Sequence, residues 1–217
     1  MKFVVTAGPT REPLDPVRYL SNRSSGKMGY ALATAALEER HEVTLISGPV
    51  ALEAPSGART MPVTTSEEMF AAASEHFAAC DVFIMCAAVC DYKPVRYAPQ
   101  KMRKEREAFS LALEPTRDLL ASLTSTPHDC FVVGFAAETQ ALAENAQRKL
   151  EEKNCDLLVA NDVSRRDVGM DSDDNEVVIF RRDGAPEKLP RAKKTELART
   201  LLKIILVTRE NCLTKKT

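Results

Sequence analysis

The chain has 217 residues, of which 30 are Lys or Arg and 31 are Asp or Glu, so its formal net charge is only −1. This length can bury a sizeable core, and we expect a single domain over residues 1–217. The basic residues are spread along the chain, which argues against a general nucleic-acid-binding surface. There is no run of about 18 apolar residues, and the amino terminus becomes polar too soon for a signal peptide. We therefore expect no membrane association and a cytoplasmic location.

The first half of the chain predicts three buried strands separated by helices. Residues 2–8 are a short apolar run typical of a buried strand, and a long polar loop with three prolines follows them. We expect a helix over 26–40 with Ser25 as its N-cap, and then a strand over 42–48. A second helix over 66–79, starting in a capping sequence at Ser66, and a third strand over 81–89 complete this half.

The pattern changes after residue 89. Three prolines, a basic cluster and a short alternating segment predict a protruding flap or β-arm near residues 92–115. Helices are then expected over 116–125, 139–154 and 193–211, and strands over 130–138, 156–162 and 176–182. The alternation of apolar strands with helices predicts an α/β, Rossmann-like fold, in which helices cover both faces of a mainly parallel sheet.

Ligands of such sheets bind at the carboxyl ends of the strands. These ends are expected just after Ala7, Ser47, Val89, Ala137 and Ala160, and most of the unusual sequence stands there. Asp91 follows the third strand, where an acid can hold a ribose hydroxyl or a magnesium ion, although a turn residue is an equal alternative.

Ser24 to Gly29 resembles the G-x-G-x-x-G phosphate-binding fingerprint, with Ser in place of the first Gly. Gly26 would allow a close backbone approach to a ligand, and Gly29 would allow the helix to pack closely on a strand. The start of the helix would offer N–H groups to an anion. A plain helix start with small residues remains an alternative explanation.

Two common nucleotide motifs do not fit this segment. A P-loop is excluded because Ser21 and Met28 stand where that motif has Gly and Ser or Thr. A dinucleotide site is disfavoured because the second strand ends in residues 46–49 without an acid for the ribose.

Cations and thiols give weaker signals. Lys101, Arg103, Lys104 and Arg106 form a basic cluster that is either a clamp over phosphates or a solvated surface. Phe135, at a strand end, can pack against a base or into the core. None of the six cysteines forms a CxxC motif, so we expect reduced thiols and no zinc site. Together these residues favour chemistry on a phosphorylated nucleotide.

Five segments resemble one known family in chain order. They are VTAGPTREPLDPVRYLSNRSSGKMG, AAVCDYKP, APQKMRK, VVGFAAET and ANDVS, and the resemblance runs from Phe3 to about Ile205. The family is phosphopantothenate–cysteine ligase, also called phosphopantothenoylcysteine synthetase, in its bacterial CTP-dependent type. In most bacteria this domain is fused to a flavin-dependent decarboxylase, and nothing in the chain corresponds to that half.

The resemblance implies an activity and its co-substrates. The family joins 4′-phosphopantothenate to L-cysteine in coenzyme A biosynthesis, using CTP and Mg²⁺. An acyl-cytidylate forms first and releases pyrophosphate, and the cysteine amine then displaces CMP. The resemblance also implies a homodimer in which the arm can reach the partner's site, and a phosphopantothenoylcysteine decarboxylase as a separate or fused partner.

The resemblance also assigns residues by motif. Asn22 is expected to bind the acyl group and assist the second step, and Lys101 to stabilise charge on the phosphates in the first. Asp91 matches the family's acidic residue in the region that binds the nucleotide and magnesium. Ser24, Ser25, Gly26 and Lys27 are expected to face the phosphate of the substrate. The remaining positions expected around CTP are Met85, Cys86, Ala87, Arg117, Asp118, Leu119, Leu120, Phe135, Lys149 and Lys153.

The chain departs from the family pattern in a few places. Residues 101–104 read KMRK where the family usually has KIKK, and residues 116–119 read TRDL where it often has NPDI. The residues alone would also allow a Rossmann-type reductase or epimerase, or a nucleotide-sensing module. The missing ribose acid argues against the reductase, and the intact Asn22 and Lys101 argue against the module.

Overall fold

A computed structural model describes residues 1–103, 108–164 and 171–214. Its helices are α1 (Lys27–Glu38), α2 (Ser66–Phe77), α3 (Leu119–Thr124), α4 (Leu142–Glu152) and α5 (Lys194–Thr214). Its strands are β1 (Lys2–Ala7), β2 (Arg11–Pro13), β3 (Tyr19–Ser21), β4 (Glu42–Ser47), β5 (Arg59–Pro62), β6 (Val82–Met85), β7 (Tyr92–Pro94), β8 (Leu113–Pro115), β9 (Phe131–Glu138), β10 (Leu157–Asp162), β11 (Asp174–Arg181) and β12 (Glu187–Lys193).

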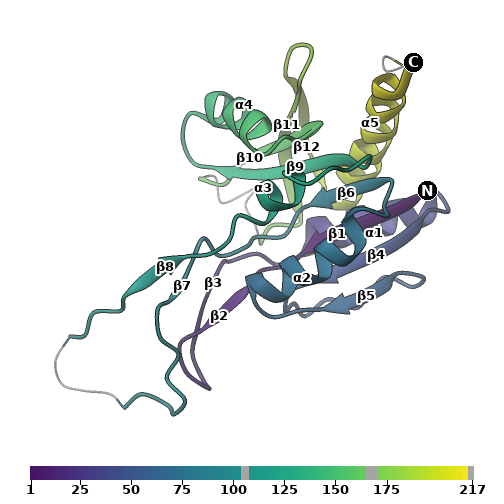
Figure 1. Cartoon of the computed structure of the whole chain (residues 1–217). Coiled ribbons are helices and arrows are strands. Elements are labelled where there is room, and N and C mark those ends of the chain that lie inside the picture. The colour runs from purple at the N-terminus through teal and green to yellow at the C-terminus, as the bar shows by residue number, and fades with distance from the viewer. Residues whose placement is uncertain (104–107, 165–170, 215–217) are drawn as a thin grey trace.

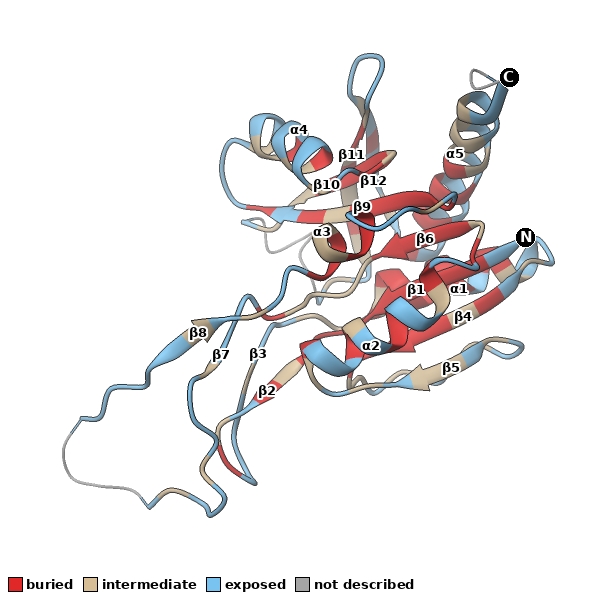
Figure 2. Ribbon diagram, viewed as in Figure 1, coloured by how far each residue is buried: buried red, intermediate tan, exposed pale blue. Residues whose placement is uncertain are grey.

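The core is a twisted sheet between two layers of helices (Figure 1). Within the described residues the sheet order is β12-β11-β10-β9-β6-β1-β4-β5. The strands from β10 to β5 in that order pair in parallel, and β11 and β12 are antiparallel. α1 and α5 pack on one face, and α2, α3 and α4 on the other. Figure 2 shows this sheet as the buried centre of the molecule. The predicted mainly parallel α/β fold is therefore confirmed.

The chain order of the strands reverses beside β1. β4 and β5 extend the sheet on one side of β1, whereas β6, β9 and β10 extend it on the other. A crevice forms at the carboxyl ends of the strands at such a reversal, and ligands of open α/β sheets bind there. Just beyond β1 and β6, Pro9 and Ala88 form an isolated parallel bridge, and the Thr10 hydroxyl accepts the Cys90 N–H at 2.9 Å. The crevice is thus lined by strand ends that are tied to each other.

Three regular segments were not predicted from the sequence. The long polar loop after β1 contains the antiparallel pair β2–β3, β5 forms an edge of the sheet, and β12 forms the other edge. β12 reads EKLPRAK, in which charges and Pro190 hide the alternation of a strand. Proline and charge are typical of edge strands because an edge strand leaves one row of backbone groups unpaired.

Two predicted helix starts are wrong by one residue. The N-cap of α1 is Gly26, not Ser25, and its φ of 77° lies in the left-handed region that glycine adopts without strain. The N-cap of α2 is Thr65, not Ser66. Thr65 and Glu68 form a capping box, in which each side chain accepts the backbone N–H of the other residue.

Gly29 allows α1 to lie directly on β1, as the sequence predicted. A β-carbon at position 29 would stand 2.6 Å from the Ala7 Cβ and 3.1 Å from the Thr6 carbonyl oxygen. We expect Gly29→Ala to lower the free energy of unfolding by about 1–3 kcal/mol, because the helix must shift to relieve the overlap. Urea denaturation measures this, with Thr34→Ala on the exposed side of α1 as the control. A loss no larger than that of the control would contradict the close packing.

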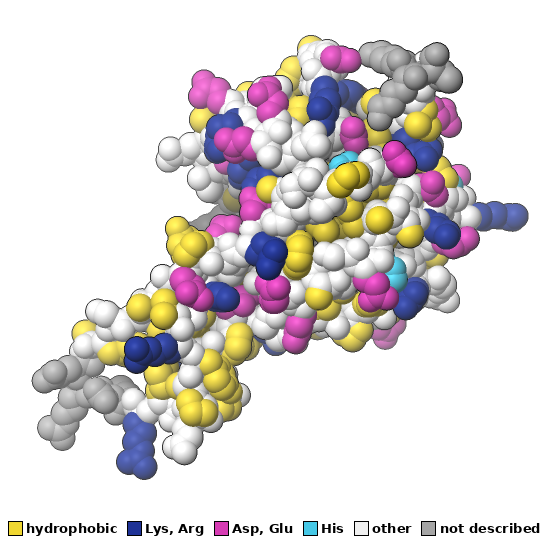
Figure 3. Space-filling model, in the orientation of Figure 1, with side chains coloured by type: hydrophobic (Ala, Val, Ile, Leu, Met, Phe, Trp, Pro, Cys, Tyr) yellow, Lys and Arg dark blue, Asp and Glu magenta, His cyan; other side chains and the backbone are white. Residues whose placement is uncertain are grey.

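Two hairpins project from the sheet as an arm. β2 pairs with β3 and β7 with β8, and both hairpins extend away from the strand ends (Figure 1). Apolar side chains gather on this projection (Figure 3). Its exposed large apolar residues are Val17, Tyr19, Tyr92, Val95, Tyr97, Phe109, Leu111 and Leu113. The predicted β-arm is therefore present, with a second hairpin beside it.

Candidate active site

A cavity of about 340 Å³ opens at the carboxyl ends of β6 and β9, beside α3. We call it the Phe135 cavity. Its lining residues are Met85, Ala87, Val89, Asp91, Thr116, Arg117, Asp118, Leu119, Leu120, Phe135, Lys149, Lys153 and Leu158. The apolar residues come mainly from the sheet and α3, whereas the charged ones come from loop ends and α4. The cavity thus combines an apolar floor with cations and carboxylates, a composition typical of small-molecule sites.

All the residues expected around the nucleotide line this cavity except Cys86 and Lys101. Successive side chains of a strand point to opposite faces of the sheet. Met85 and Ala87 accordingly belong to the layer of α2–α4, whereas Cys86 packs in the layer of α1 and α5. Burial raises the pKa of the Cys86 thiol to about 12. Lys101 stands on the arm instead.

The cations of the Phe135 cavity are held by carboxylates. Lys149 Nζ lies 2.7 Å from Glu138 Oε1, and Glu138, only 9% exposed, also accepts from Asn145 Nδ2 at 3.1 Å. Lys153 forms an ion pair with Asp118. Burial lowers the pKa of Lys153, because desolvation disfavours its charged form. The ion pair of Glu138 with Lys149 was not predicted from the sequence. The available signal was an acidic residue at the end of a buried strand.

The loop before α3 presents two further charged residues to the cavity. Asp118 caps α3 by accepting the Ala121 N–H at 3.1 Å, so the fold fixes its position. The Arg117 guanidinium lies 4.3 Å from the centre of the Phe70 ring and 3.6 Å from Glu67 Oε1. Both residues are thus oriented by α2 and α3 before any ligand arrives.

A second cavity of about 360 Å³ lies beside the first. We call it the Asn22 cavity, and its lining residues are Pro9, Arg11, Tyr19, Ser21, Asn22, Arg23, Ser24, Pro49 and Asp171. Asn22 Nδ2 donates to the carbonyl oxygens of Ala88 and Val89, each at 3.0 Å. Since Ala87 and Val89 line the Phe135 cavity, Asn22 reaches the strand end that borders both cavities.

The predicted phosphate loop lies at the edge of the Asn22 cavity. Ser24 lines that cavity, and its hydroxyl accepts the Gly26 N–H at 3.4 Å. A β-carbon on Gly26 would stand 2.8 Å from Val50 Cγ1, so only glycine fits this turn. Ser25 is half-buried. Lys27 Nζ is bound to Asp173 Oδ1 at 2.6 Å and to the Asp171 carbonyl at 3.2 Å. Gly26 thus packs closely against Val50, while the Lys27 side chain is engaged by Asp171 and Asp173.

The arm carries Lys101, which is exposed. Among the described residues it does not contribute to the lining of the Phe135 cavity. Its neighbour Met102 is bound through its backbone to Asp15 and Arg18 in the turn between β2 and β3. Arg103 is exposed, and Lys104 and Arg106 lie outside the described residues. Sequence reasoning missed Asp15, because an Asp-Pro pair reads as an ordinary turn.

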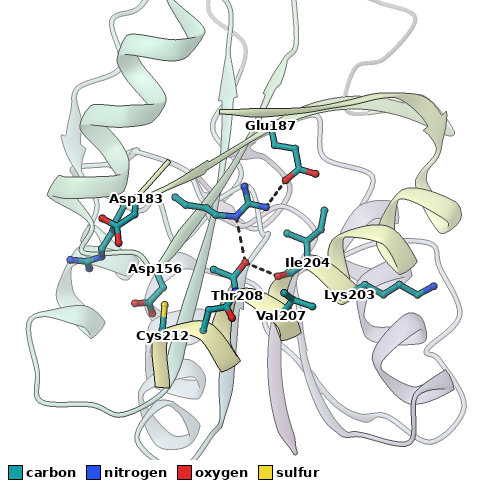
Figure 4. Close-up of a pocket in the computed structure, with 11 residues that line it drawn as sticks. Asp156, Asp183, Glu187, Lys203, Ile204, Val207, Thr208 and Cys212 are labelled. Atoms are coloured by element: carbon teal, nitrogen blue, oxygen red, sulfur yellow. Dashed lines mark hydrogen bonds and ion pairs between the residues drawn. The ribbon is translucent and has the colours of Figure 1, made fainter. Parts of the chain in front are cut away.

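A larger cavity, about 570 Å³, lies between β11, β12 and α5 (Figure 4). There Arg181 pairs with Glu187 and donates to the Thr208 hydroxyl at 3.4 Å. Asp156, which precedes β10, also lines it. This cavity therefore lies at the amino-terminal end of β10, opposite the crevice. Ligands of open α/β sheets bind at the carboxyl ends of the strands, so we do not take this cavity as the candidate site despite its larger volume.

Fold and cavities together define a Rossmann-like α/β protein with a charged crevice at its topological switch point. No helix in the described ranges 1–103, 108–164 and 171–214 is both long and apolar enough to cross a bilayer. Residues 1–208 match the family model described as DNA/pantothenate metabolism flavoprotein C-terminal domain. The chain belongs to this family.

Three similar proteins illustrate the family. The coenzyme A biosynthesis bifunctional protein CoaBC of Vibrio cholerae is 44% identical over 207 residues, covering 94% of this chain and 52% of the relative. The CoaBC protein of Bacillus subtilis is 44% identical over 203 residues, covering 93% and 50%. The chain therefore spans about half the length of these relatives. A crystal structure of the C-terminal domain of a CoaBC protein has a TM-score of 0.82 and 40% identity, covering 97% of this chain and 96% of that chain.

Proposed function

We propose that this protein is a phosphopantothenate–cysteine ligase. It joins 4′-phosphopantothenate to L-cysteine through an acyl-cytidylate and gives 4′-phosphopantothenoylcysteine, CMP and pyrophosphate. The observation that carries the proposal is the Phe135 cavity, which gathers residues from β6, the loop before α3, β9 and α4 that the family motifs assign to the nucleotide. Family membership and the names of the CoaBC relatives support the same reaction class.

The reaction has two steps because a carboxylate is a poor acyl electrophile. A carboxylate oxygen of the substrate first attacks the α-phosphorus of CTP, and pyrophosphate leaves with the electron pair of the broken P–O bond. The cysteine amine then attacks the acyl carbon, loses a proton, and CMP leaves. The cations Arg117, Lys149 and Lys153 fit the task of holding a polyanionic nucleotide in the Phe135 cavity. Its apolar floor keeps water from the mixed anhydride.

Magnesium fits the carboxylates at this cavity. Mg²⁺ usually takes one or two protein carboxylates and finds its other ligands among water and phosphate oxygens. Asp91 and Asp118 line the cavity, and no cluster of three or more metal-binding side chains occurs in the described part of the chain. Asp91 would hold a nucleotide-bound ion, which would neutralise phosphate charge.

Asn22 suits the second step. Two backbone carbonyls accept from its amide nitrogen, which assigns the orientation of the amide. Both of its N–H donors are therefore used, and Oδ1 is the atom that can accept from the cysteine amine. Ser24, Ser25, Gly26 and Lys27 would face the phosphate end of 4′-phosphopantothenate, and displacement of Asp173 would release Lys27 for that contact.

A direct assay tests the proposed function. The protein is mixed with 4′-phosphopantothenate, cysteine, Mg²⁺ and one of CTP, ATP, GTP, UTP or NAD, and pyrophosphate and the coupled product are measured. We expect both products with CTP at the highest rate. Absence of pyrophosphate with every nucleotide would overturn the ligase, and turnover with NAD would instead favour a reductase.

We also propose that the protein is a homodimer whose arms exchange between sites. The projecting hairpins expose a set of large apolar side chains, including Val17, Tyr97 and Phe109, and such surfaces mark protein interfaces. Lys101 lies on this arm. It is not among the described residues that line the Phe135 cavity. An arm that crosses to a second copy would supply Lys101 to the partner's site, consistent with the symmetry of two-fold dimers.

Mixing two inactive variants tests this exchange. Lys101→Ala and Asn22→Ala subunits are refolded together, so that a mixed dimer has one site with both native residues if Lys101 acts on the partner. We expect about a quarter of the wild-type activity from random mixing. Arms that act within their own subunit would leave the mixture as inactive as its components. Sedimentation velocity on the wild type checks the dimer itself.

From the lowered pKa of Lys153 we expect nucleotide binding to depend on pH. Burial lowers its pKa below that of an ordinary lysine, so it loses its charge at a lower pH than exposed lysines do. Affinity for CTP should be full while Lys153 is protonated and should fall as the pH rises through its lowered pKa. Lys153→Arg should move this fall to higher pH, because arginine stays charged. Calorimetric titration across the alkaline range measures both, and identical profiles for wild type and variant would contradict the role of Lys153.

Two further expectations rest on the same proposal. The product carries the carboxylate of cysteine, so a phosphopantothenoylcysteine decarboxylase is the expected partner, either separate or fused, and a cytoplasmic location fits the expected reduced thiols. All six cysteines lie in the described residues, and each is a free thiol there.

A further inference from the structure

The turn between β2 and β3 is bonded to the arm beside Lys101. The Ala98 N–H donates to the Leu14 carbonyl at 2.9 Å. Four residues further along the arm, the Met102 N–H donates to Asp15 Oδ2 at 3.1 Å, and Arg18 Nη2 donates to the Met102 carbonyl at 2.9 Å. Both backbone groups of Met102 are thus held by one turn, and Lys101 directly precedes Met102.

Asp15 is the centre of these contacts. Its residue is 3% exposed, and its Oδ1 accepts the N–H groups of Val17 and Arg18, each at 2.8 Å. Its Oδ2 accepts from Arg18 Nε at 2.9 Å, from Arg18 Nη2 and from the Met102 N–H. The Arg18 guanidinium and the three backbone donors hold the pKa of the Asp15 carboxyl well below its usual range. One oxygen therefore shapes the turn, and the other binds the arm.

The same hairpin also leads to Asn22. β3 ends at Ser21, whose hydroxyl donates to the Thr10 carbonyl at 2.8 Å, and Asn22 follows directly. The turn between Leu14 and Arg18 therefore belongs to the hairpin that leads to Asn22, and it is hydrogen-bonded to the separate arm that carries Lys101.

We propose that Asp15 is a positioning residue that sets where Lys101 is presented for the first half-reaction. The inference rests on the proposed function, because Lys101 matters only if the protein activates a carboxylate with CTP. Asp15 lines neither the Phe135 cavity nor the Asn22 cavity. It fixes the backbone of Met102, and a displacement of about 1 Å in a group that stabilises the reacting phosphates can cost roughly 100-fold in rate.

Asp15→Asn separates the two tasks of this side chain. Its amide oxygen can still accept from the Val17 and Arg18 N–H groups, so the turn keeps these two backbone hydrogen bonds and loses those from the Arg18 guanidinium to Oδ2. The amide nitrogen then stands where Oδ2 was and faces the Met102 N–H as donor against donor. The matched control is Glu12→Gln in β2, which removes one carboxylate charge from the same hairpin. Glu12 Oε1 accepts the Ser66 N–H of α2 at 2.8 Å and has no recorded bond to the described part of the arm.

The test measures the two half-reactions separately in the 217-residue protein. We expect Asp15→Asn to slow single-turnover pyrophosphate release by about 10-fold to 100-fold. Transfer of supplied acyl-cytidylate to cysteine should stay within about twofold of wild type, and Glu12→Gln should change neither rate by more than that. Equal loss in both half-reactions, or in both variants, would overturn the positioning role in favour of a general structural one.

A double-mutant cycle with Lys101→Ala then asks whether Asp15 acts through Lys101. In the Lys101→Ala background we expect Asp15→Asn to slow pyrophosphate release by no more than about twofold further, since the group it positions is gone. Multiplying effects would overturn the inference while leaving the ligase intact. A wild-type protein that releases no pyrophosphate would overturn the ligase and, with it, this role of Asp15.

Discussion

Lys101→Ala is expected to abolish most of the first half-reaction, slowing pyrophosphate release by about 100-fold to 1,000-fold. In the proposed first step the oxygens on the α-phosphorus of CTP gain negative charge as the carboxylate attacks, and the Lys101 ammonium would stabilise that charge. Lys101 is exposed, so its side chain can reach a bound phosphate. Rapid-quench measurement of pyrophosphate in the absence of cysteine isolates this step.

The control for Lys101 is the neighbouring cation on the same arm. Arg103→Ala removes an exposed charge two residues away and should leave pyrophosphate release within about threefold, because exposed charges at a distance are screened. Lys101→Arg should recover part of the rate by keeping the charge. A normal pyrophosphate burst in Lys101→Ala would remove this lysine from the first step.

Asn22→Ala is expected to leave the first step intact and to block the second. The substitution removes the donors to Ala88 and Val89 and, with them, the proposed acceptor for the cysteine amine. We expect one equivalent of pyrophosphate per site, accumulation of the acyl-cytidylate, and coupling to cysteine slowed by about 100-fold to 1,000-fold. Mass spectrometry of quenched samples detects the intermediate directly.

Asn211→Ala is the matched control for this substitution, because Asn211 lines the cavity of Figure 4 at the other end of the molecule. It should release pyrophosphate and couple cysteine at wild-type rates. If Asn22→Ala failed to release pyrophosphate even once, Asn22 would belong to the activation step, and its contacts with the border of the Phe135 cavity would have to serve the nucleotide.

The parallel part of the fold could be predicted because its strands are buried on both faces and therefore read as short apolar runs. KFVVTA in β1 and VFIM in β6 are buried along almost their whole length. The helices between them were predicted from their apolar periodicity. The edge strands β5 and β12 and the pair β2–β3 were missed because partial exposure admits charges and proline.

The residues expected around the nucleotide could be named from motifs, but their arrangement could not. Cys86 stands between Met85 and Ala87 in the sequence, yet strand alternation turns it to the opposite face of the sheet. Likewise, the hydrogen bond from the Met102 N–H to Asp15 joins residues 87 positions apart. Contacts of this kind depend on how two hairpins meet in space, which no local pattern encodes.

We propose that one cavity, the Phe135 cavity, activates a carboxylate as an acyl-cytidylate. The most direct measurement is to incubate the protein with 4′-phosphopantothenate, CTP and Mg²⁺ without cysteine, and to analyse the quenched mixture by mass spectrometry. We expect phosphopantothenoyl-cytidylate and pyrophosphate in equal amounts, with conversion to 4′-phosphopantothenoylcysteine and CMP when cysteine is added. Unchanged CTP and substrate, with the protein folded, would contradict it.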